Sequence, residues 1–151
     1  MSKKAAPGGA RTVAGLIRLV VPAGKAAPAP PVGPALGQKG LNLMEFCKSF
    51  NDKTKDFKES TPIPVVITAF SDRTFTYEMK TPQTTYLIKQ ATGIKYGAGR
   101  PGDETCGEIS IKKIYEIAKI KQQDLSHVGL EQMCSQIVST CKSMGVKVVR
   151  Y

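Results

Sequence analysis

The chain has 151 residues, enough for one medium domain or two small ones, and 41% of them are hydrophobic, which suffices for a globular core. Lys and Arg outnumber Asp and Glu by 22 to 12, for a formal net charge of +10, which favours a polyanionic partner such as nucleic acid. Both halves are basic and no apolar run approaches the ~20 residues that cross a bilayer, so we expect a soluble protein and not a neutral enzyme domain with a basic tail.

The first segment, residues 1–15, contains no acidic residue. An acid-free start is compatible with mitochondrial targeting, but Pro7, Gly8 and Gly9 would interrupt an amphipathic helix, so we expect a short basic tail. The apolar run Leu16–Val21 then predicts a strand.

Residues 22–40 are rich in proline and glycine, with five of the first and four of the second. Proline fixes φ and lacks an N–H donor, which argues against an ordinary helix or a central strand. Val32, Ala35 and Leu36 supply apolar anchors, so we expect a rigid, ordered surface loop. A plain Pro-rich spacer is the alternative.

Asn42, followed three residues later by Glu45, has the capping-box pattern and predicts the start of a helix. The apolar residues that follow have helical spacing: Leu43, Phe46, Cys47 and Phe50. Two strand-like runs, Ile63–Phe70 and Thr74–Met79, flank a turn and predict a hairpin. Residues 16–80 are therefore predicted to form a small α+β domain.

The second half begins with another helix. Thr81 is the predicted N-cap, Pro82 the first helical residue and Gly93 the end. A long Gly-rich loop with few apolar anchors follows at residues 95–107.

Two more helices are predicted after this loop. Ser110 can cap the first, whose apolar stripe is Ile111, Ile114, Ile117 and Ala118. The last helix has the clearest stripe: Leu130, Met133, Cys134, Ile137, Val138, Cys141 and Met144. A short strand at residues 146–149 closes the chain. Residues 81–151 thus predict a three-helix domain with a long loop and a short strand.

The sequence offers little support for a catalytic site or a metal site. His127 is the single histidine, and no partners for a triad or a metal site can be nominated. The four cysteines form no CxxC pair, which favours core residues in a reducing compartment over zinc ligands. Residues 97–102 read GAGRPG, a literal GxGxxG, but they follow a predicted helix where a dinucleotide site needs a strand. We expect no enzyme, no metal and no cofactor, with a nucleotide-binding enzyme as one rival.

Two features favour RNA as the polyanion. Glycines beside Lys95 and Arg100 would let the backbone approach a sugar-phosphate chain while the cations neutralise it. Polar and small hydroxyl side chains, which suit a shallow RNA groove, lie on the exposed side of the last helix: Gln136, Ser139, Thr140, Lys142 and Ser143. An ordinary polar face is the alternative for this helix. A helix-turn-helix DNA-binding module is the other rival, although its reading face would carry more Arg, Asn or Gln.

Several stretches, from about Leu16 to Val149, resemble the L-eleven (L11) family of large-subunit ribosomal proteins. The most specific is PAPPVGPALGQKGLNLMEFCKSFNDKT at residues 28–54. The resemblance continues through PIPVVITAFSDRTFT, KTPQTTYLIKQATGIKYGAGRP and STCKSMGVKVV.

The resemblance implies a two-domain protein at the stalk base of the large subunit, in the GTPase-associated centre. Its C-terminal domain would bind rRNA through the loop and the last helix, at Lys95, Gly97, Gly99, Arg100, Pro101, Ser139, Thr140, Ser143 and Met144. Its N-terminal domain would face translation factors, with Pro31 and Pro34 lining a thiopeptide-antibiotic site. The implied partners are large-subunit rRNA, neighbouring stalk ribosomal proteins and, transiently, translational GTPases, but neither DNA nor a membrane.

Two details refine this resemblance. Ser139 departs from the family pattern, which commonly has glycine at that position. Residues 114–124 (IYEIAKIKQQD) look more similar to mitochondrial members than to bacterial ones. Together with the acid-free start, they favour the mitochondrial matrix, with the bacterial cytoplasm or the plastid stroma as the alternative.

Overall fold

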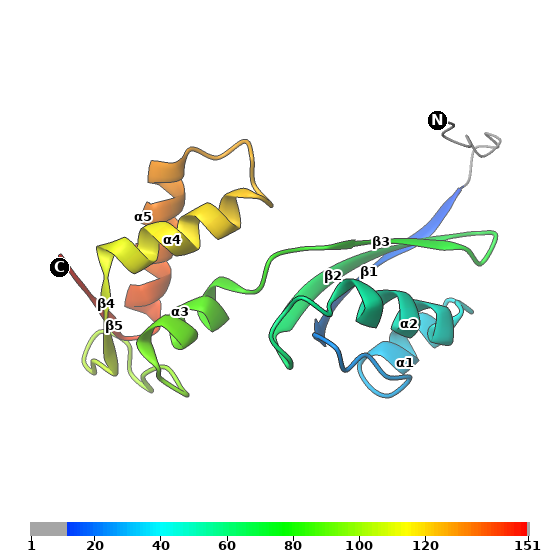
Figure 1. Ribbon diagram of the computed structural model, residues 1–151, viewed down its shortest axis with the longest axis horizontal. Helices are drawn as coiled ribbons and strands as arrows, with labels where there is room; N and C mark the ends of the chain where they lie inside the picture. Colours follow the sequence, from blue (N-terminus) through cyan, green and yellow to red (C-terminus); the bar gives the residue numbers. More distant parts are fainter. Residues whose placement is uncertain (1–11, 151) are drawn as a thin grey trace. The chain divides into compact units, whose positions relative to one another are not determined.

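The computed structural model describes residues 12–150, and Figure 1 shows their elements along the chain. Within this range the chain forms five helices and five strands, which confirms the predicted mixture of helix and sheet. The contacts divide the chain into two compact units. The N-terminal unit extends to Thr61 and includes Val65–Met79, whereas the C-terminal unit combines Pro62–Pro64 with the chain from Lys80. None of the helices in the described range is long and apolar enough to cross a membrane.

The N-terminal unit contains a three-stranded sheet in which β2 is central and β1 and β3 are the edges. The strands are β1 (Val13–Pro22), β2 (Pro62–Phe70) and β3 (Phe75–Met79). β2 and β3 form the predicted antiparallel hairpin, with Val65 opposite Met79 and Ala69 opposite Phe75. Alternate residues of β2 are buried, as expected for a sheet covered on one face.

Strand β1 begins earlier than the sequence predicted. Residues 13–15, which we assigned to the basic tail, belong to the strand, and just before it the Ser71 N–H donates to the Thr12 carbonyl at 3.0 Å. Pairing with a partner strand extends β1 into residues whose own composition carries no strand signal. Residues 1–11 of the predicted tail lie outside the described range.

The Pro/Gly segment contains a short helix, α1 (Val32–Gly37), which corrects the prediction of a loop without helix. Pro31 is the N-cap and Pro34 falls in the first turn, where backbone N–H groups have no partner within the helix, so neither proline breaks it. Val32 and Leu36 are buried, as the sequence suggested, whereas Ala35 is half-buried.

The rest of the Pro/Gly segment is held by the next helix, α2 (Leu43–Lys53). The Asn51 side chain accepts from the Ala26 N–H at 3.0 Å and donates to the Ala26 carbonyl at 3.2 Å. The buried Thr54 hydroxyl accepts from the Gly24 N–H at 3.1 Å and donates to the Phe50 carbonyl at 2.9 Å. These bonds confirm an ordered segment and exclude a plain spacer.

Helix α2 begins at its predicted cap and covers one face of the sheet, together with α1 (Figure 1). The Asn42 side chain accepts from the Glu45 N–H at 3.4 Å. Phe46 is fully buried and stacks on Phe50, and it meets the Tyr77 ring edge-on at a centroid distance of 5.4 Å. Aromatic rings thus fill the space between α2 and the sheet, where such pairs stabilise beyond their buried area.

The C-terminal unit consists of three helices and two short strands. In chain order they are α3 (Thr84–Thr92), β4 (Gly107–Ser110), α4 (Ile111–Gln122), α5 (Leu130–Ser143) and β5 (Val146–Val149). β4 and β5 pair in parallel, with Ile109 opposite Val148. β4 was not predicted from the sequence, because a run of four residues carries no clear period.

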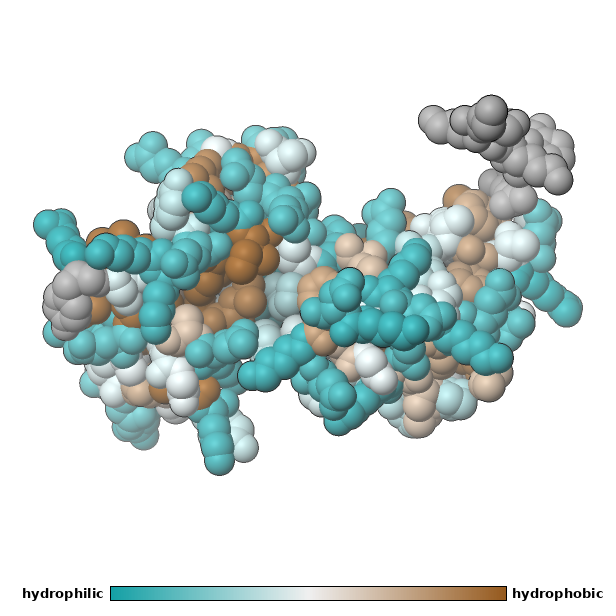
Figure 2. All heavy atoms as spheres, in the orientation of Figure 1, coloured by the Kyte–Doolittle hydropathy of each residue, from teal (hydrophilic) through white to brown (hydrophobic). Residues whose placement is uncertain are grey.

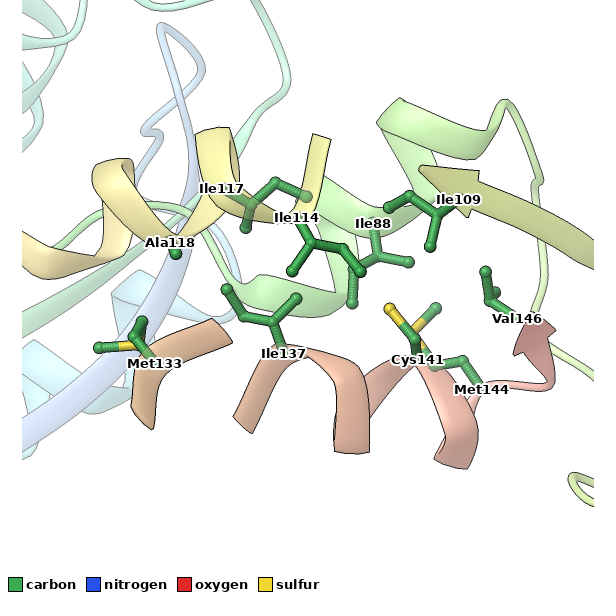
Figure 3. Packing of buried hydrophobic residues seen from close by; sticks show 10 residues of the cluster. All are labelled: Ile88, Ile109, Ile114, Ile117, Ala118, Met133, Ile137, Cys141, Met144 and Val146. Carbon is green, nitrogen blue, oxygen red and sulfur yellow. The ribbon is translucent and has the colours of Figure 1, made fainter. Parts of the chain in front are cut away.

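Apolar residues of all three helices form the core of this unit. Figure 3 shows Ile88, Ile114 and Ile137, from α3, α4 and α5, pointing toward one another. Ser110 caps α4 by accepting from the Lys112 N–H, as predicted. Ile111, which we placed in the apolar stripe, is 46% exposed, and Ile109 of β4 is buried instead.

The start of α3 also differs from the prediction, because its N-cap is Gln83 and not Thr81. The Thr81 N–H and hydroxyl both donate to the carboxylate of Asp124, beyond the end of α4, with an N–O distance of 2.9 Å. Lys121 lies 3.7 Å from the same carboxylate, and both charged side chains are only 16% exposed. The Thr81 hydroxyl therefore bonds to Asp124, a residue far along the chain, and does not cap α3 as the local pattern predicted.

Candidate nucleic-acid interface

The Gly-rich loop (residues 95–106) is attached to the end of α5 at two points. The Ala98 N–H donates to the Met144 carbonyl at 3.0 Å, and the Cys106 N–H donates to the Gly145 carbonyl at 2.9 Å. The Cys106 thiol also lies 3.3 Å from the Met144 carbonyl oxygen. Both halves of the loop are thereby fixed on the junction between α5 and β5.

Glycine is required where the loop meets this junction. Gly145 has φ of +73°, and a Cβ built there would lie 2.5 Å from the Ala98 Cβ and 2.8 Å from the Glu104 carbonyl oxygen. A Cβ at Gly97 would lie 3.2 Å from the Met144 carbonyl oxygen. The loop backbone therefore packs directly on the end of the helix, with no room for a side chain at Gly145.

Every residue predicted to contact rRNA from the loop is exposed: Lys95, Gly97, Gly99, Arg100 and Pro101. The loop is neutral by itself, because Asp103 and Glu104 balance its two cations. Neither cation forms an ion pair within residues 12–150. Lys142, exposed on the last turn of α5, supplies the excess positive charge beside the loop.

Helix α5 presents the predicted hydroxyl groups next to the loop, and each donates its proton back to its own helix. The Ser139 hydroxyl donates to the Ser135 carbonyl at 3.0 Å, Thr140 to Gln136 at 2.9 Å and Ser143 to Thr140 at 2.8 Å. Ser139 and Ser143 are exposed and Thr140 is half-buried. Each hydroxyl oxygen keeps lone pairs that can accept a further hydrogen bond.

Met144, also predicted as a contact, belongs to the core. Its side chain is 8% exposed and packs with Cys141 and Val146 (Figure 3). Its carbonyl accepts from Ala98. Its burial leaves little side-chain surface for the predicted rRNA contact, whereas its carbonyl holds the loop.

Tyr96, also in this loop, was not among the predicted contacts. Its side chain is 80% exposed, the largest value among the exposed large hydrophobic residues of the described chain. The sequence did contain a signal for this exposed residue. Tyr96 stands between Lys95 and Gly97 and belongs to no periodic apolar pattern that would predict its burial.

Pro31 and Pro34, predicted to face factors and antibiotics, lie in the N-terminal unit. Both are exposed at the start of α1, with Val32 and Leu36 buried beneath. The two prolines thus form a surface on a segment that the core holds in place.

No group of three His, Cys, Asp or Glu side chains is placed to hold a metal ion in residues 12–150. The GxGxxG run follows α3 and leads into β4, the reverse of the strand-to-helix order of a dinucleotide site.

A groove of about 230 Å³ between α3 and α4 is mainly apolar. Leu87, Ala91, Ile117 and Ile120 are among its lining residues, and Figure 2 shows a hydrophobic area over these helices. Its polar lining residues are Gln90, Lys113 and Glu116.

Comparison with protein families matches both halves of the chain. Residues 17–75 match the family model "Ribosomal protein L11, N-terminal domain", and residues 80–148 match "Ribosomal protein L11, RNA binding domain". The second match spans the Gly-rich loop and α5. Members of this family are structural proteins of the ribosome and not enzymes. The chain belongs to the ribosomal protein L11 family, and it is a ribosomal protein that binds rRNA.

Proposed function

We propose that this chain binds and stabilises the rRNA of the GTPase-associated centre, at the stalk base of the large subunit, and so supports the action of translation factors. The attachment of the Gly-rich loop to the end of α5 carries the proposal, because it joins two RNA-compatible features in one surface. The loop supplies exposed glycines and cations, and the helix supplies small acceptors beside them.

Each predicted residue then has a role that its chemistry supports. Lys95 and Arg100 neutralise phosphates, and Gly97, Gly99 and Pro101 leave the loop backbone open to a sugar-phosphate chain. The hydroxyl oxygens of α5 accept from ribose 2′-hydroxyls. Met144 holds the loop through its carbonyl, and its contact with rRNA stays a prediction.

The two units divide the work in this proposal. Residues 81–151 hold the rRNA, and residues 16–80 face the translational GTPases and the neighbouring stalk proteins, with Pro31 and Pro34 at the factor- and thiopeptide-facing edge. The mitochondrial ribosome is the proposed location, with a bacterial or plastid ribosome as the alternative. Neither DNA nor a membrane is a partner.

The test is the salt dependence of binding between the full chain and a transcript of the rRNA stalk-base region. If about three to five phosphates are neutralised, log K falls with log salt at a slope of roughly −2 to −5. An affinity that does not change with salt would contradict the electrostatic part of the proposal. Duplex DNA serves as the competitor. If the chain binds the duplex more tightly than the transcript, the alternative of a DNA-binding module is favoured.

A pair of variants locates the contact. Arg100→Ala is expected to weaken binding by about 1–3 kcal/mol through loss of a charge-assisted contact. Arg18→Ala removes an exposed arginine from β1 in the other unit and should leave the affinity nearly unchanged. Equal losses in both variants would indicate a general charge effect and remove the Gly-rich loop from the site.

A further inference from the structure

The ring of Tyr96 is exposed to solvent, whereas most other aromatic side chains form a ring contact, a cation–π contact or a hydrogen bond. Tyr77 bonds with Ser49 and packs on Phe46, and Tyr115 has the Lys119 ammonium 4.7 Å from its ring centroid. Tyr96 has no hydrogen bond or ring contact within the described residues, and its side chain is 80% exposed. An aromatic ring this exposed forgoes the burial that normally stabilises it.

The loop cannot move this ring into the core without breaking its attachments. Ile94, two residues before, packs against the core of the C-terminal unit. Ala98, two residues after, is bonded to the Met144 carbonyl, and Gly97 lies against that same oxygen. Only Lys95–Gly97 span the interval between these anchors, so the backbone holds the ring outward.

The surroundings of Tyr96 select one kind of ligand. A protein partner with an apolar surface would need apolar neighbours beside the ring, but the residues next to it in the sequence are Lys95 and Gly97, both exposed. A flat ring beside a cation matches a nucleobase whose phosphate lies next to it, and such stacking tolerates any base because each has a π-face.

We propose that Tyr96 stacks on an unpaired base of the rRNA that this chain binds. The inference rests on the proposed RNA interface and deepens it, because it adds a contact to a base where the other loop residues contact only the backbone. A base within a regular helix is already stacked on both faces, so the target is a nucleotide in a loop, bulge or turn of the RNA.

Substitutions at Tyr96 test the stacking by affinity, using the full chain and a transcript of the rRNA stalk-base region. Tyr96→Ala is expected to weaken binding about 5- to 150-fold, equivalent to about 1–3 kcal/mol for one stacked base. Tyr96→Phe keeps the ring and should retain most of the affinity. Tyr115→Ala, which removes a tyrosine that is 43% exposed on α4, is the matched control and should bind as the unmodified chain does.

Fluorescence gives a direct readout, because the chain contains no tryptophan. Tyr96→Trp introduces a single indole, whose emission should be quenched when it stacks on a base, whereas Tyr115→Trp should show little change on adding the same RNA. Quenching at Tyr96→Trp, with the affinity retained, supports stacking.

The outcomes separate this inference from the proposed function. If the unmodified chain binds the transcript and Tyr96→Ala binds equally well, stacking is overturned and the interface stands. If Tyr96→Phe loses as much as Tyr96→Ala, the hydroxyl and not the ring makes the contact, which also overturns it. If the unmodified chain fails to bind the transcript, both the interface and the stacking are wrong.

Discussion

Substituting Gly145 by alanine tests whether the Gly-rich loop is packed on the end of α5. The added methyl group would overlap the Ala98 Cβ at 2.5 Å and the Glu104 carbonyl oxygen at 2.8 Å. Neither neighbour is the flexible end of a long side chain. The loop must therefore lift from the junction, or the junction must distort.

A second glycine provides the matched control. Gly93 ends α3 with φ of +75°, almost the same as the +73° of Gly145, but a Cβ there would meet nothing within 4 Å. Gly93→Ala thus carries only the cost of a left-handed alanine, about 1–2 kcal/mol. Gly145→Ala carries that cost and an overpacking term of about 1–3 kcal/mol. The entropy that alanine removes from the unfolded chain is common to both and cancels in the comparison.

Urea denaturation followed by circular dichroism measures the two free energies of unfolding, and rRNA affinity is measured where both variants are folded. We expect Gly145→Ala to be the less stable by about 1–3 kcal/mol and to bind rRNA more weakly, because the loop is displaced. Gly93→Ala should keep its affinity. Equal stabilities and equal affinities would refute the packing of the loop on Gly145.

Asp124→Asn should lower the free energy of unfolding by about 1–3 kcal/mol, because the charged acceptor of the Thr81 N–H and hydroxyl is lost in a largely buried site. Its control, Asp52→Asn, breaks an exposed ion pair and should change the same quantity much less. Similar losses in the two variants would contradict the importance of the buried network. For the thiols, burial raises the pKa of Cys141 above its ordinary value of 9.0, so the folded chain keeps a proton that the unfolded chain releases. Stability should therefore decrease as the pH rises above about 9, and it should decrease less steeply in Cys141→Ala. Identical pH profiles of the two chains, measured by urea denaturation, would contradict this. Modification of Cys141 before Cys134 by a thiol reagent in the folded protein would also contradict it.

Features that depend on a few neighbouring residues could be predicted from the sequence. The Asn42 cap of α2, the Ser110 cap of α4 and the end of α3 at Gly93 all depend on contacts within about one helical turn. The apolar stripe of α5 was recovered for the same reason, since one face of a helix repeats every few residues.

Features decided by distant partners were missed. Strand β4 exists because it pairs with β5, which follows two helices later, and its four residues show no period of their own. Thr81 has the composition of a helix cap, but Asp124 competes for its hydroxyl. A local sequence pattern cannot show whether a side chain bonds to such a distant partner or caps the nearby helix.

The candidate site was predicted in its composition but not in its construction. The exposed cations and glycines were evident from the Gly-rich loop itself. The need for glycine at position 145 was not, because it arises from Ala98 and Glu104 in three dimensions. Met144 was predicted to contact rRNA from the family resemblance, whereas its burial follows from its place in the stripe of α5.

The direction of the hydroxyl bonds on α5 sharpens what this surface would recognise. A hydroxyl that keeps the bond to its own helix can accept from a ribose 2′-hydroxyl, whereas it must give up that bond to donate to a phosphate. We infer a division in which Lys95, Arg100 and Lys142 take phosphates while Ser139 and Ser143 take riboses. Duplex DNA offers the same phosphates but no 2′-hydroxyl, so the acceptors of α5 would gain no partner from it. On this division, we propose that the preference for RNA resides in α5 and that the salt dependence of binding resides in the cations.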